Sequence, residues 1–182
     1  MSPGRPKLTT SRLLLRCPRI EDFDAYAAFM ADERSASYVG GVQSRPVAWR
    51  GFVSLAGAWE LQGFAMFSVI LRETGEWIGR VGPWMPEGWP GTEVGWGISP
   101  DHLNEGFATE AATAAIDWAF DVLGWDEVIH VIDPRNEPSI AVAQKLGASN
   151  RGPGRLPEPF ESATIDIWGQ TRNEWHERRS DC

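Results

Sequence analysis

Three segments with the composition of β-strands follow one another in the middle of the chain, and no other feature of the sequence constrains the fold as strongly. They are residues 64–71, 77–81 and 93–98. The turn at residues 73–76, Glu-Thr-Gly-Glu, predicts that the first two segments pair as a hairpin. Residues 83–90 contain three prolines, so we expect a loop there, because proline cannot donate a hydrogen bond to a β-ladder. A hairpin-linked region is therefore predicted at the centre of the chain.

The residues before this region show the period of a strand and then that of a helix. Residues 13–17 place apolar side chains at every second position, which predicts a first strand. Residues 20–30 have apolar side chains at helical spacing. Residues 47–61 predict a second helix, with Pro46 in its first turn.

The residues after the central region predict alternating helices and strands. A helix is expected from about residue 107 to residue 123, ended by Gly124, and a strand at residues 128–132. Asn136 is the expected N-cap of a further helix that ends at residue 146, and residues 163–170 predict a last strand. Hairpins followed by strand–helix–strand units predict an α/β or α+β fold with one mixed central sheet and helices on both faces.

The composition is that of one globular domain. The chain has 182 residues, of which 42% are hydrophobic and 23% charged, and this fits a single domain over residues 1–182. No stretch approaches the roughly twenty apolar residues that span a bilayer, and the basic start lacks the apolar segment of a secretory signal. We therefore expect a cytoplasmic protein with no membrane partner, in which residues 171–182 form a tail or a short helix.

The charge of the chain excludes one class of partner. The net charge is −8, and residues 1–20 carry five basic and no acidic side chains, so the rest is more negative still. Such a field disfavours nucleic acid and favours a cationic small molecule or a basic peptide. The three histidines lack the spacing of a metal site, and Cys17 and Cys182 are not expected to pair, so neither a metal nor a disulfide is predicted.

Residues 93–110, EVGWGISPDHLNEGFATE, are the first candidate site. A strand is followed by a loop that contains Gly106 and then by an alanine-rich helix. The free N–H groups and the positive end of that helix converge on one point, which suits a pyrophosphate. The negative charge of Glu105 opposes the binding of an anion unless its side chain points away. The alternative interpretation of the segment is an ordinary strand–helix connection.

Residues 136–139, Asn-Glu-Pro-Ser, are the second candidate site. Their simplest interpretation is the N-cap of a helix. No histidine is identifiably placed to activate Ser139 as a nucleophile, and the nucleophile-elbow motif of hydrolases is absent. A Ser–His–acid hydrolase is therefore not predicted.

Taken together, these two segments resemble the GNAT superfamily of acetyl-CoA-dependent N-acetyltransferases. Within it, the likeness is to the branch of the bacterial ribosomal-protein N-terminal acetyltransferases, and it covers about residues 8–170. It is carried by LTTSRLLLRCPRIEDFDAY, GEWIGRVG, EVGWGISPDHLNEGFATEAATAAIDWAFDVLGW and NEPSIAVAQKLGA. The resemblance implies a mostly antiparallel sheet with a V-shaped splay between two parallel strands, residues 93–98 and 128–132. It also implies acetyl-CoA as a co-substrate in that opening.

The cofactor loop of the family, Q/R-x-x-G-x-G/A, is matched by residues 103–108. Gly106 and Ala108 are in place, whereas Leu103 replaces the usual Gln or Arg, Asn104 a frequent glycine and Glu105 a frequent base. Because the phosphates in this family are bound mainly by backbone N–H groups, the loop is still expected to bind them. A backbone N–H near Ile98 would polarise the thioester carbonyl. The cofactor-binding residues that the resemblance implies are Gly97, Ile98, Ser99, Leu103, Asn104, Glu105, Gly106, Phe107, Ala108, Thr109 and Asn136.

The resemblance also implies which groups move protons. Glu93 matches an acidic position of the branch and would take the proton of the amine, directly or through a water; an exposed strand residue is the alternative. Ser139 matches the position from which a hydroxyl reaches the departing sulfur. Many relatives use a tyrosine there, but Tyr26 and Tyr38 lie far upstream. His130 is a second candidate base and otherwise a structural residue.

Two tryptophans, Trp84 and Trp89, precede the strand at residues 93–98. With His130 they are candidates for the acceptor pocket, where an indole ring can stack on a cation, and packing under the loop is the alternative. The predicted function is transfer of the acetyl group to a primary amine by direct attack in a ternary complex. The alternative is a catalytically idle acyl-CoA-binding or regulatory module on the same fold. The acceptor is open among a protein N-terminus, a polyamine, an amino acid and an antibiotic, and a homodimer is an open alternative to a monomer.

Overall fold

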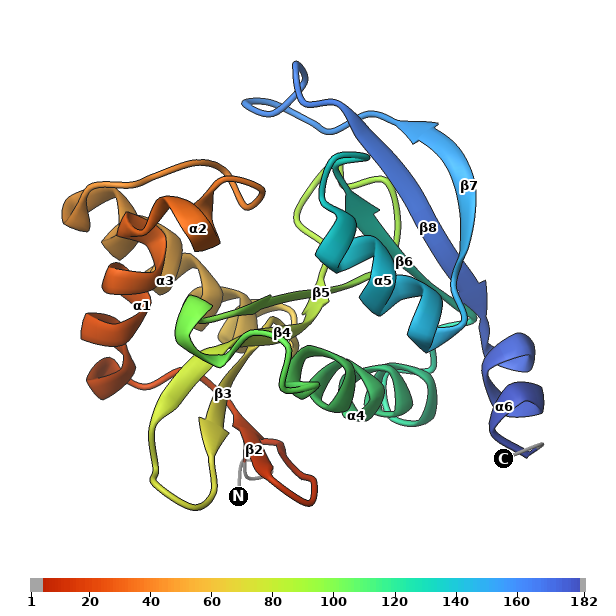
Figure 1. Cartoon of the computed structure of the whole chain (residues 1–182), viewed down its shortest axis with the longest axis horizontal. Helices are drawn as coiled ribbons and strands as arrows, with labels where there is room; N and C mark the ends of the chain where they lie inside the picture. The colour runs from red at the N-terminus through yellow and green to blue at the C-terminus, as the bar shows by residue number, and fades with distance from the viewer. Residues whose placement is uncertain (1–4, 181–182) are drawn as a thin grey trace.

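The central element of the protein is one twisted sheet. The computed structural model describes residues 5–180, and within them eight strands form the sheet in the order β1-β2-β3-β4-β5-β6-β8-β7. All neighbours are antiparallel except β5 and β6, which run parallel. The strands are β1 (Lys7–Thr9), β2 (Leu13–Arg16), β3 (Phe67–Leu71), β4 (Trp77–Trp84), β5 (Glu93–Ile98), β6 (Glu127–Ile132), β7 (Ser149–Gly154) and β8 (Ile165–Thr171). Figure 1 shows this sheet running through the whole molecule.

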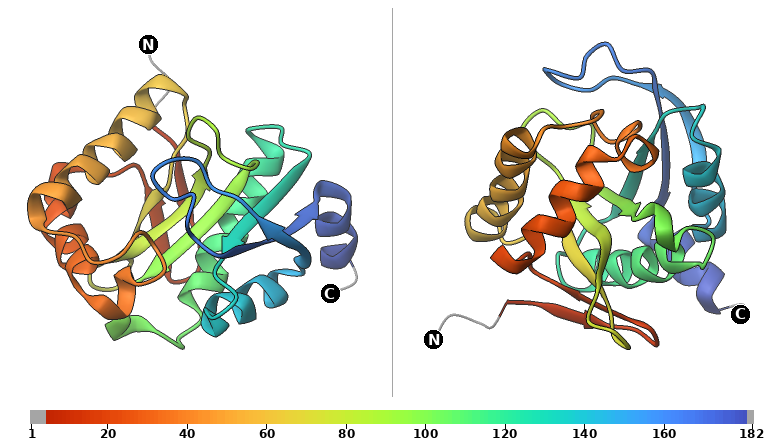
Figure 2. Two further views of the ribbon diagram at one scale, coloured as in Figure 1. Left: turned by 90° about the horizontal axis from the view of Figure 1, so that it is seen from above. Right: turned by 60° about the vertical axis from the view of Figure 1, so that its left-hand side comes forward.

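The helices cover both faces of this sheet, as predicted (Figure 2). They are α1 (Phe23–Ala31), α2 (Glu33–Ala36), α3 (Arg45–Leu61), α4 (Phe107–Asp121), α5 (Glu137–Leu146) and α6 (Arg172–Ser180). On one face, the Phe29 ring of α1 packs edge-on against Trp77, with 5.8 Å between ring centroids. On the other face, the Trp118 ring of α4 packs edge-on against Phe67 at 5.3 Å. These aromatic contacts anchor the two helical layers to the strands.

The parallel pair separates almost as soon as it forms. β5 and β6 are paired in register at Glu93 and Ile129 alone, and the Ile129 N–H donates to the Thr92 carbonyl at 2.9 Å. Beyond that point each strand keeps its antiparallel partner on the other side, β4 or β8. The V-shaped splay that the resemblance implied is therefore present between the predicted strands.

Several element boundaries differ from the prediction. The loop predicted for residues 83–90 begins later, because β4 continues through Pro83 to Trp84. β3 begins at Phe67, opposite Val81, so the last residues of β4 pair only with β5, and a strand with one open edge tolerates proline. β1 and α2 were not predicted because they are too short to show a period. β7 was missed because its sequence, SNRGPG, has the composition of a turn. The C-terminal segment forms the short helix α6.

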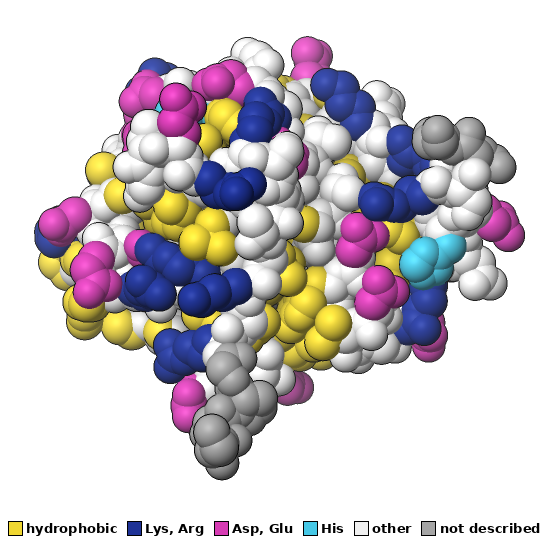
Figure 3. Space-filling view, turned by 90° about the horizontal axis from the view of Figure 1, so that it is seen from below, with side chains coloured by type: hydrophobic (Ala, Val, Ile, Leu, Met, Phe, Trp, Pro, Cys, Tyr) yellow, Lys and Arg dark blue, Asp and Glu magenta, His cyan; other side chains and the backbone are white. Residues whose placement is uncertain are grey.

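The charged residues are not spread evenly over the surface. Arg5, Lys7, Arg16 and Arg19 line a shallow hollow beside β1 and β2, as their clustering in residues 1–20 leads one to expect. Figure 3 shows Lys and Arg side chains on both halves of the face seen from below, with one group of them at the left, and Asp and Glu mostly toward its edges. Cys17 is a buried free thiol, and Cys182 lies outside the described residues. Between residues 5 and 180, no helix combines the length and the apolar character needed to cross a membrane.

Candidate active site

Glu93 lies at the point where β5 and β6 separate. Its side chain is buried, with the residue 6% exposed, so the alternative of an exposed strand residue is wrong. Oε1 accepts a hydrogen bond from the Val131 N–H at 3.1 Å, and Oε2 accepts one from the Trp89 indole N–H at 2.6 Å. The carboxylate thus occupies the place that a carbonyl of β5 would take if the parallel ladder continued. A carboxylate is thereby fixed at the apex of the V.

The environment of Glu93 brings the pKa of its carboxyl close to neutral pH. Burial raises the pKa of this carboxyl to about 7, although the hydrogen bonds from Val131 and Trp89 and the charge of Arg80 act in the opposite direction. A carboxyl with a pKa near the working pH can both accept and return a proton.

The backbone of β5 turns amide groups toward the opening. The N–H and C=O groups of a strand alternate between its two edges from one residue to the next. The Ser99 N–H donates to the Ile78 carbonyl of β4 at 2.7 Å, whereas the Val94 carbonyl, on the other edge, lies 2.7 Å from His130 of β6. The N–H groups of Trp96 and Ile98 therefore face the side from which β6 has diverged, where they can donate to a carbonyl oxygen.

Ser139 faces the same opening from the first turn of α5. Its N–H donates to Oδ1 of Asn136 at 3.3 Å, so Asn136 is the predicted N-cap. Its Oγ accepts a hydrogen bond of 3.3 Å from the indole N–H of Trp96, which crosses from β5. Because Oγ acts as an acceptor toward Trp96, the hydroxyl proton is left to bind a second acceptor. Ser139 can thus donate to a developing anion such as a thiolate.

His130 lies against Trp96 and not against Trp84 or Trp89. It is 1% exposed, and its ring centroid is 4.8 Å from that of Trp96. Since a carbonyl can only accept, Nδ1 carries the proton that is shared with Val94, and Nε2 has no partner among the described residues. Burial lowers the pKa of His130 to about 4, so the ring is neutral at neutral pH.

Trp84 and Trp89 meet beside Glu93. The two rings are edge to face, with 6.3 Å between centroids, and Trp84 is paired with Glu93 across β4 and β5. Because side chains alternate along a strand, Glu93 and Trp96 belong to opposite faces of β5. The structure therefore brings Trp84, Trp89 and Glu93 together on one face and places His130 and Trp96 on the other.

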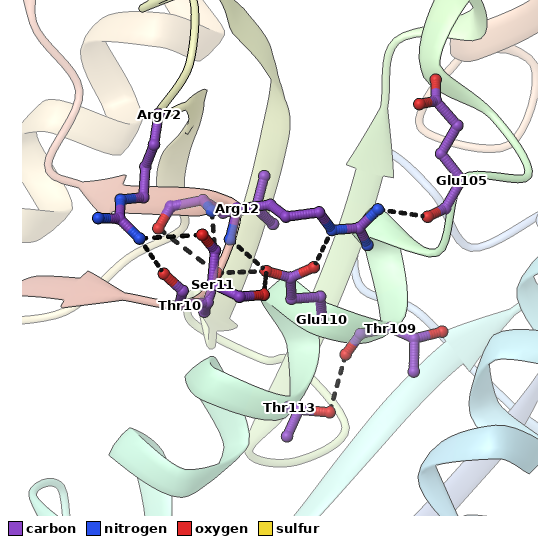
Figure 4. Close-up of polar contacts among 9 residues, drawn as sticks. Thr10, Ser11, Arg12, Arg72, Glu105, Thr109, Glu110 and Thr113 are labelled. Carbon is purple, nitrogen blue, oxygen red and sulfur yellow. Dashed lines mark hydrogen bonds and ion pairs between the residues drawn. The ribbon is translucent and has the colours of Figure 1, made fainter.

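The predicted cofactor loop joins β5 to α4 through two left-handed residues. Asn104 has φ 64° and Gly106, the N-cap of α4, has φ 82°. The first N–H groups of α4, at Phe107, Ala108 and Thr109, have no carbonyl one turn earlier to bind. The Glu105 carboxylate lies 3.5 Å from His102 Nδ1 and points away from the start of α4 (Figure 4). The condition set by the sequence, that this side chain should point away, is therefore met.

The sequence analysis missed three residues that the structure places at these sites. Trp96 stands between two glycines in β5, and a large side chain between Gly95 and Gly97 was the available signal. Arg12 lies in the turn between β1 and β2, and Glu110 lies in α4. They form an ion pair with 2.7 Å between Nε and Oε2, and nothing local in the sequence indicated it. Within residues 5–180, no group of His, Cys, Asp and Glu is arranged to hold a metal ion.

A buried base, free N–H donors and a hydroxyl around one opening are the parts that acyl transfer requires. Residues 12–149 match the acetyltransferase (GNAT) domain family. The chain is 30% identical over 164 residues to an uncharacterized N-acetyltransferase p20 of Bacillus licheniformis, covering 88% of this chain and 92% of that protein.

Solved structures agree. An acetyltransferase from Agrobacterium tumefaciens superposes with a TM-score of 0.83 at 32% identity, over 94% of this chain and 98% of that one. A putative ribosomal-protein-serine acetyltransferase from Vibrio cholerae shares the fold, with a TM-score of 0.73 at 22% identity over 94% and 99% of the two chains. The branch named in the predicted resemblance is thus represented among the structural neighbours. The chain belongs to the GNAT family of acetyltransferases.

Proposed function

We propose that the protein transfers the acetyl group of acetyl-CoA to a primary amine by direct attack in a ternary complex. The observation that carries this proposal is the buried carboxylate of Glu93, held by two hydrogen bonds where β5 and β6 separate. An amine must be neutral before its lone pair can attack a carbonyl carbon. Glu93 takes the proton from the amine, directly or through a water.

The donor side of the opening stabilises the other changes of charge. Attack on the thioester carbon places negative charge on the carbonyl oxygen, toward which the Ile98 N–H would donate. When the intermediate collapses, the carbon–sulfur bond breaks and its electron pair stays on sulfur. The Ser139 hydroxyl, oriented by Trp96, donates its proton to that thiolate and regains one from solvent water. The nitrogen, which carries one extra proton after the attack, releases it to solvent as the amide forms, and Glu93 returns its own proton to solvent before the next turnover. The products are an N-acetylated amine and the thiol of CoA.

The family resemblance and the local geometry support a position for the rest of the donor. Pantetheine runs along Gly97, Ile98 and Ser99 and reaches the N-cap residue Asn136. The diphosphate lies at residues 103–109, where Gly106 turns the chain into α4 and leaves its first N–H groups free. Phosphate oxygens accept hydrogen bonds well from backbone N–H groups. The departures from the family motif at residues 103–105 change side chains only, so these N–H groups are still present.

The acceptor enters from the face that carries Trp84 and Trp89. The two indoles flank Glu93, and an aromatic face attracts a cationic amine until it loses its proton. The acceptor class is therefore a small amine or a protein N-terminus. The name of the Vibrio cholerae relative, a putative ribosomal-protein-serine acetyltransferase, favours including N-terminal peptides in the test.

The experiment is a measurement of thiol release from acetyl-CoA with two panels of acceptors, N-terminal peptides and small amines. Amine-dependent release, with acetylated product identified by mass spectrometry, is the expected result. Calorimetric titration of CoA into the protein is run in parallel. CoA binding without turnover on either panel would support the idle module instead, and absence of CoA binding would refute the proposal.

A further inference from the structure

The loop that precedes α4 turns sharply and lies close to acidic side chains. Asn104 and Gly106 are both left-handed, a conformation that asparagine and glycine adopt more readily than other residues. The loop also contains Glu105, and Glu110 lies in the first turn of α4. The Glu105 side chain points away from α4, but the Glu110 carboxylate opposes the binding of a diphosphate at the helix start unless a cation offsets it. The loop itself supplies no Lys or Arg.

Arg12 supplies a cation from a distant part of the chain. Its Nη1 donates to the Glu105 carbonyl at 2.9 Å, and its guanidinium lies 4.3 Å above the centroid of the Phe107 ring. Its Nη2 is 3.5 Å from the place where a Cβ at Gly106 would stand. One side chain therefore contacts the residues on both sides of Gly106, at the junction between the loop and α4.

Glu110 holds this arginine in place. Its Oε2 accepts from Nε of Arg12 at 2.7 Å, and its Oε1 accepts from the Arg12 backbone N–H at 3.0 Å. Oε1 also accepts from the hydroxyls of Thr10 and Ser11, and all these contacts are drawn in Figure 4. Burial acts to raise the pKa of Glu110, but these hydrogen bonds outweigh it and keep the pKa below its ordinary value. Glu110 is therefore a charged clamp, and its charge is neutralised by Arg12.

We infer that Arg12, clamped by Glu110, is a positioning residue that holds the turn at Gly106 so that the first N–H groups of α4 face the diphosphate of the acyl donor. The inference rests on the proposed function, because it takes the donor to be acetyl-CoA. It follows that Arg12 affects the affinity for the nucleotide end of the donor, whereas groups around the V between β5 and β6 carry out the proton transfers.

The test compares Arg12→Gln and Arg12→Lys with a matched control, Arg45→Gln. Arg45 makes the same two kinds of contact, an ion pair with Asp24 and a cation–π contact 4.6 Å from the Phe23 ring centroid, on other elements. Calorimetric titration with CoA measures affinity without any acceptor. We expect Arg12→Gln to raise the Kd for CoA about tenfold, the equivalent of one lost hydrogen bond to a charged group. Arg12→Lys should recover part of the affinity, and Arg45→Gln should leave it unchanged.

Kinetics provide the second readout. With an acceptor that the wild type uses, Arg12→Gln should raise the KM for acetyl-CoA and leave kcat within about twofold of the wild type, since the loop binds ground state and transition state alike. A fall in kcat equal to the change in KM would mean general damage and would overturn the inference. So would an unchanged CoA affinity in folded Arg12→Gln.

A third variant keeps the inference testable if Arg12→Gln does not fold. Glu110→Gln retains the shape of the clamp but not its charge, and it should weaken CoA binding in the same direction as Arg12→Gln. Unchanged affinity in Glu110→Gln would refute the role of the clamp. If the wild type itself bound no CoA, the proposed function would fail; if the wild type bound CoA and none of these variants altered it, the inference alone would fail.

Discussion

Replacement of Glu93 by glutamine removes the buried carboxylate at the apex of the V and keeps the size of the side chain. The glutamine carbonyl can still accept from the Val131 N–H, which now binds Oε1 at 3.1 Å. What is lost is basicity, and the loss of a general base lowers rates by about 10²–10⁴-fold. We therefore expect kcat/KM for the amine to fall by about 10²-fold or more, with CoA affinity unchanged.

The pH dependence identifies the base. With a pKa of about 7, Glu93 must be ionised to take a proton, so kcat/KM of the wild type should rise with pH through an acid limb near that value. Glu93→Gln should lack this limb. If His130 were the base, its pKa of about 4 would place the limb far lower. The assay is the initial rate of thiol release over the full pH range in which the protein is folded.

A matched control is Glu127→Gln. Glu127 is an exposed carboxylate at the start of β6 that pairs with Arg151 at 2.6 Å, so its loss should leave the rate and the pH profile as they are. The reasoning is refuted if Glu93→Gln keeps the wild-type rate at every pH with an acceptor that the wild type turns over. His130 or a water chain along the backbone would then be the base.

Four further outcomes are expected. Gly106→Asp should raise the Kd for CoA in calorimetry more than Gly106→Ala does, because both variants strain the left-handed N-cap but only aspartate repels the diphosphate; equal effects would contradict a phosphate site. Ser139→Ala should lower kcat by less than Glu93→Gln does, since a water replaces a hydroxyl donor at small cost. A loss of kcat as large as that of Glu93→Gln would contradict the assignment of Ser139 as a replaceable proton donor. Trp89→Phe removes the N–H that donates to Glu93 and lowers its pKa, so the acid limb of the pH profile should move to higher pH. An unmoved limb would mean that the group that titrates is not the carboxylate bound by Trp89. Because burial holds the pKa of Glu93 near 7, above its ordinary 4.5, ionisation of Glu93 opposes folding: the contribution of this group to stability is fully present below about pH 4.5 and is lost, by at most about 3 kcal/mol, as pH rises through 7. The difference in urea-unfolding free energy between the wild type and Glu93→Gln should therefore change over this pH range, and a difference that is independent of pH would contradict it.

Much of the site was predictable because it depends on short-range interactions. Asn136 was expected to cap α5, and its Oδ1 accepts from the N–H three residues later. Gly106 was expected at the turn into α4, and it occupies the left-handed region there. Such features need only a few neighbouring residues, so the local sequence is sufficient to specify them.

The same reasoning fails where a strand depends on its partners. Pro83 has the local character of a loop residue, but it lies in β4 because β5 pairs with it on one side and β3 does not reach it on the other. β7 has a turn-like sequence and becomes a strand because β8 offers it an edge. Strand pairing is a property of two segments, and the sequence of one of them cannot report it.

By itself, the sequence determined the order of the longer helices and strands, the turn at Gly106, the N-cap at Asn136, and the resemblance to the GNAT family. Only the tertiary structure decided that Glu93 is buried rather than exposed, since its burial requires β6, some 38 residues further along, to donate the Val131 N–H to its carboxylate. The same holds for Arg12 and Glu110, which are 98 residues apart. The physical reason is that a hydrogen bond inside a turn is set by a few backbone torsions, whereas the environment of a charge is set by every segment that packs around it.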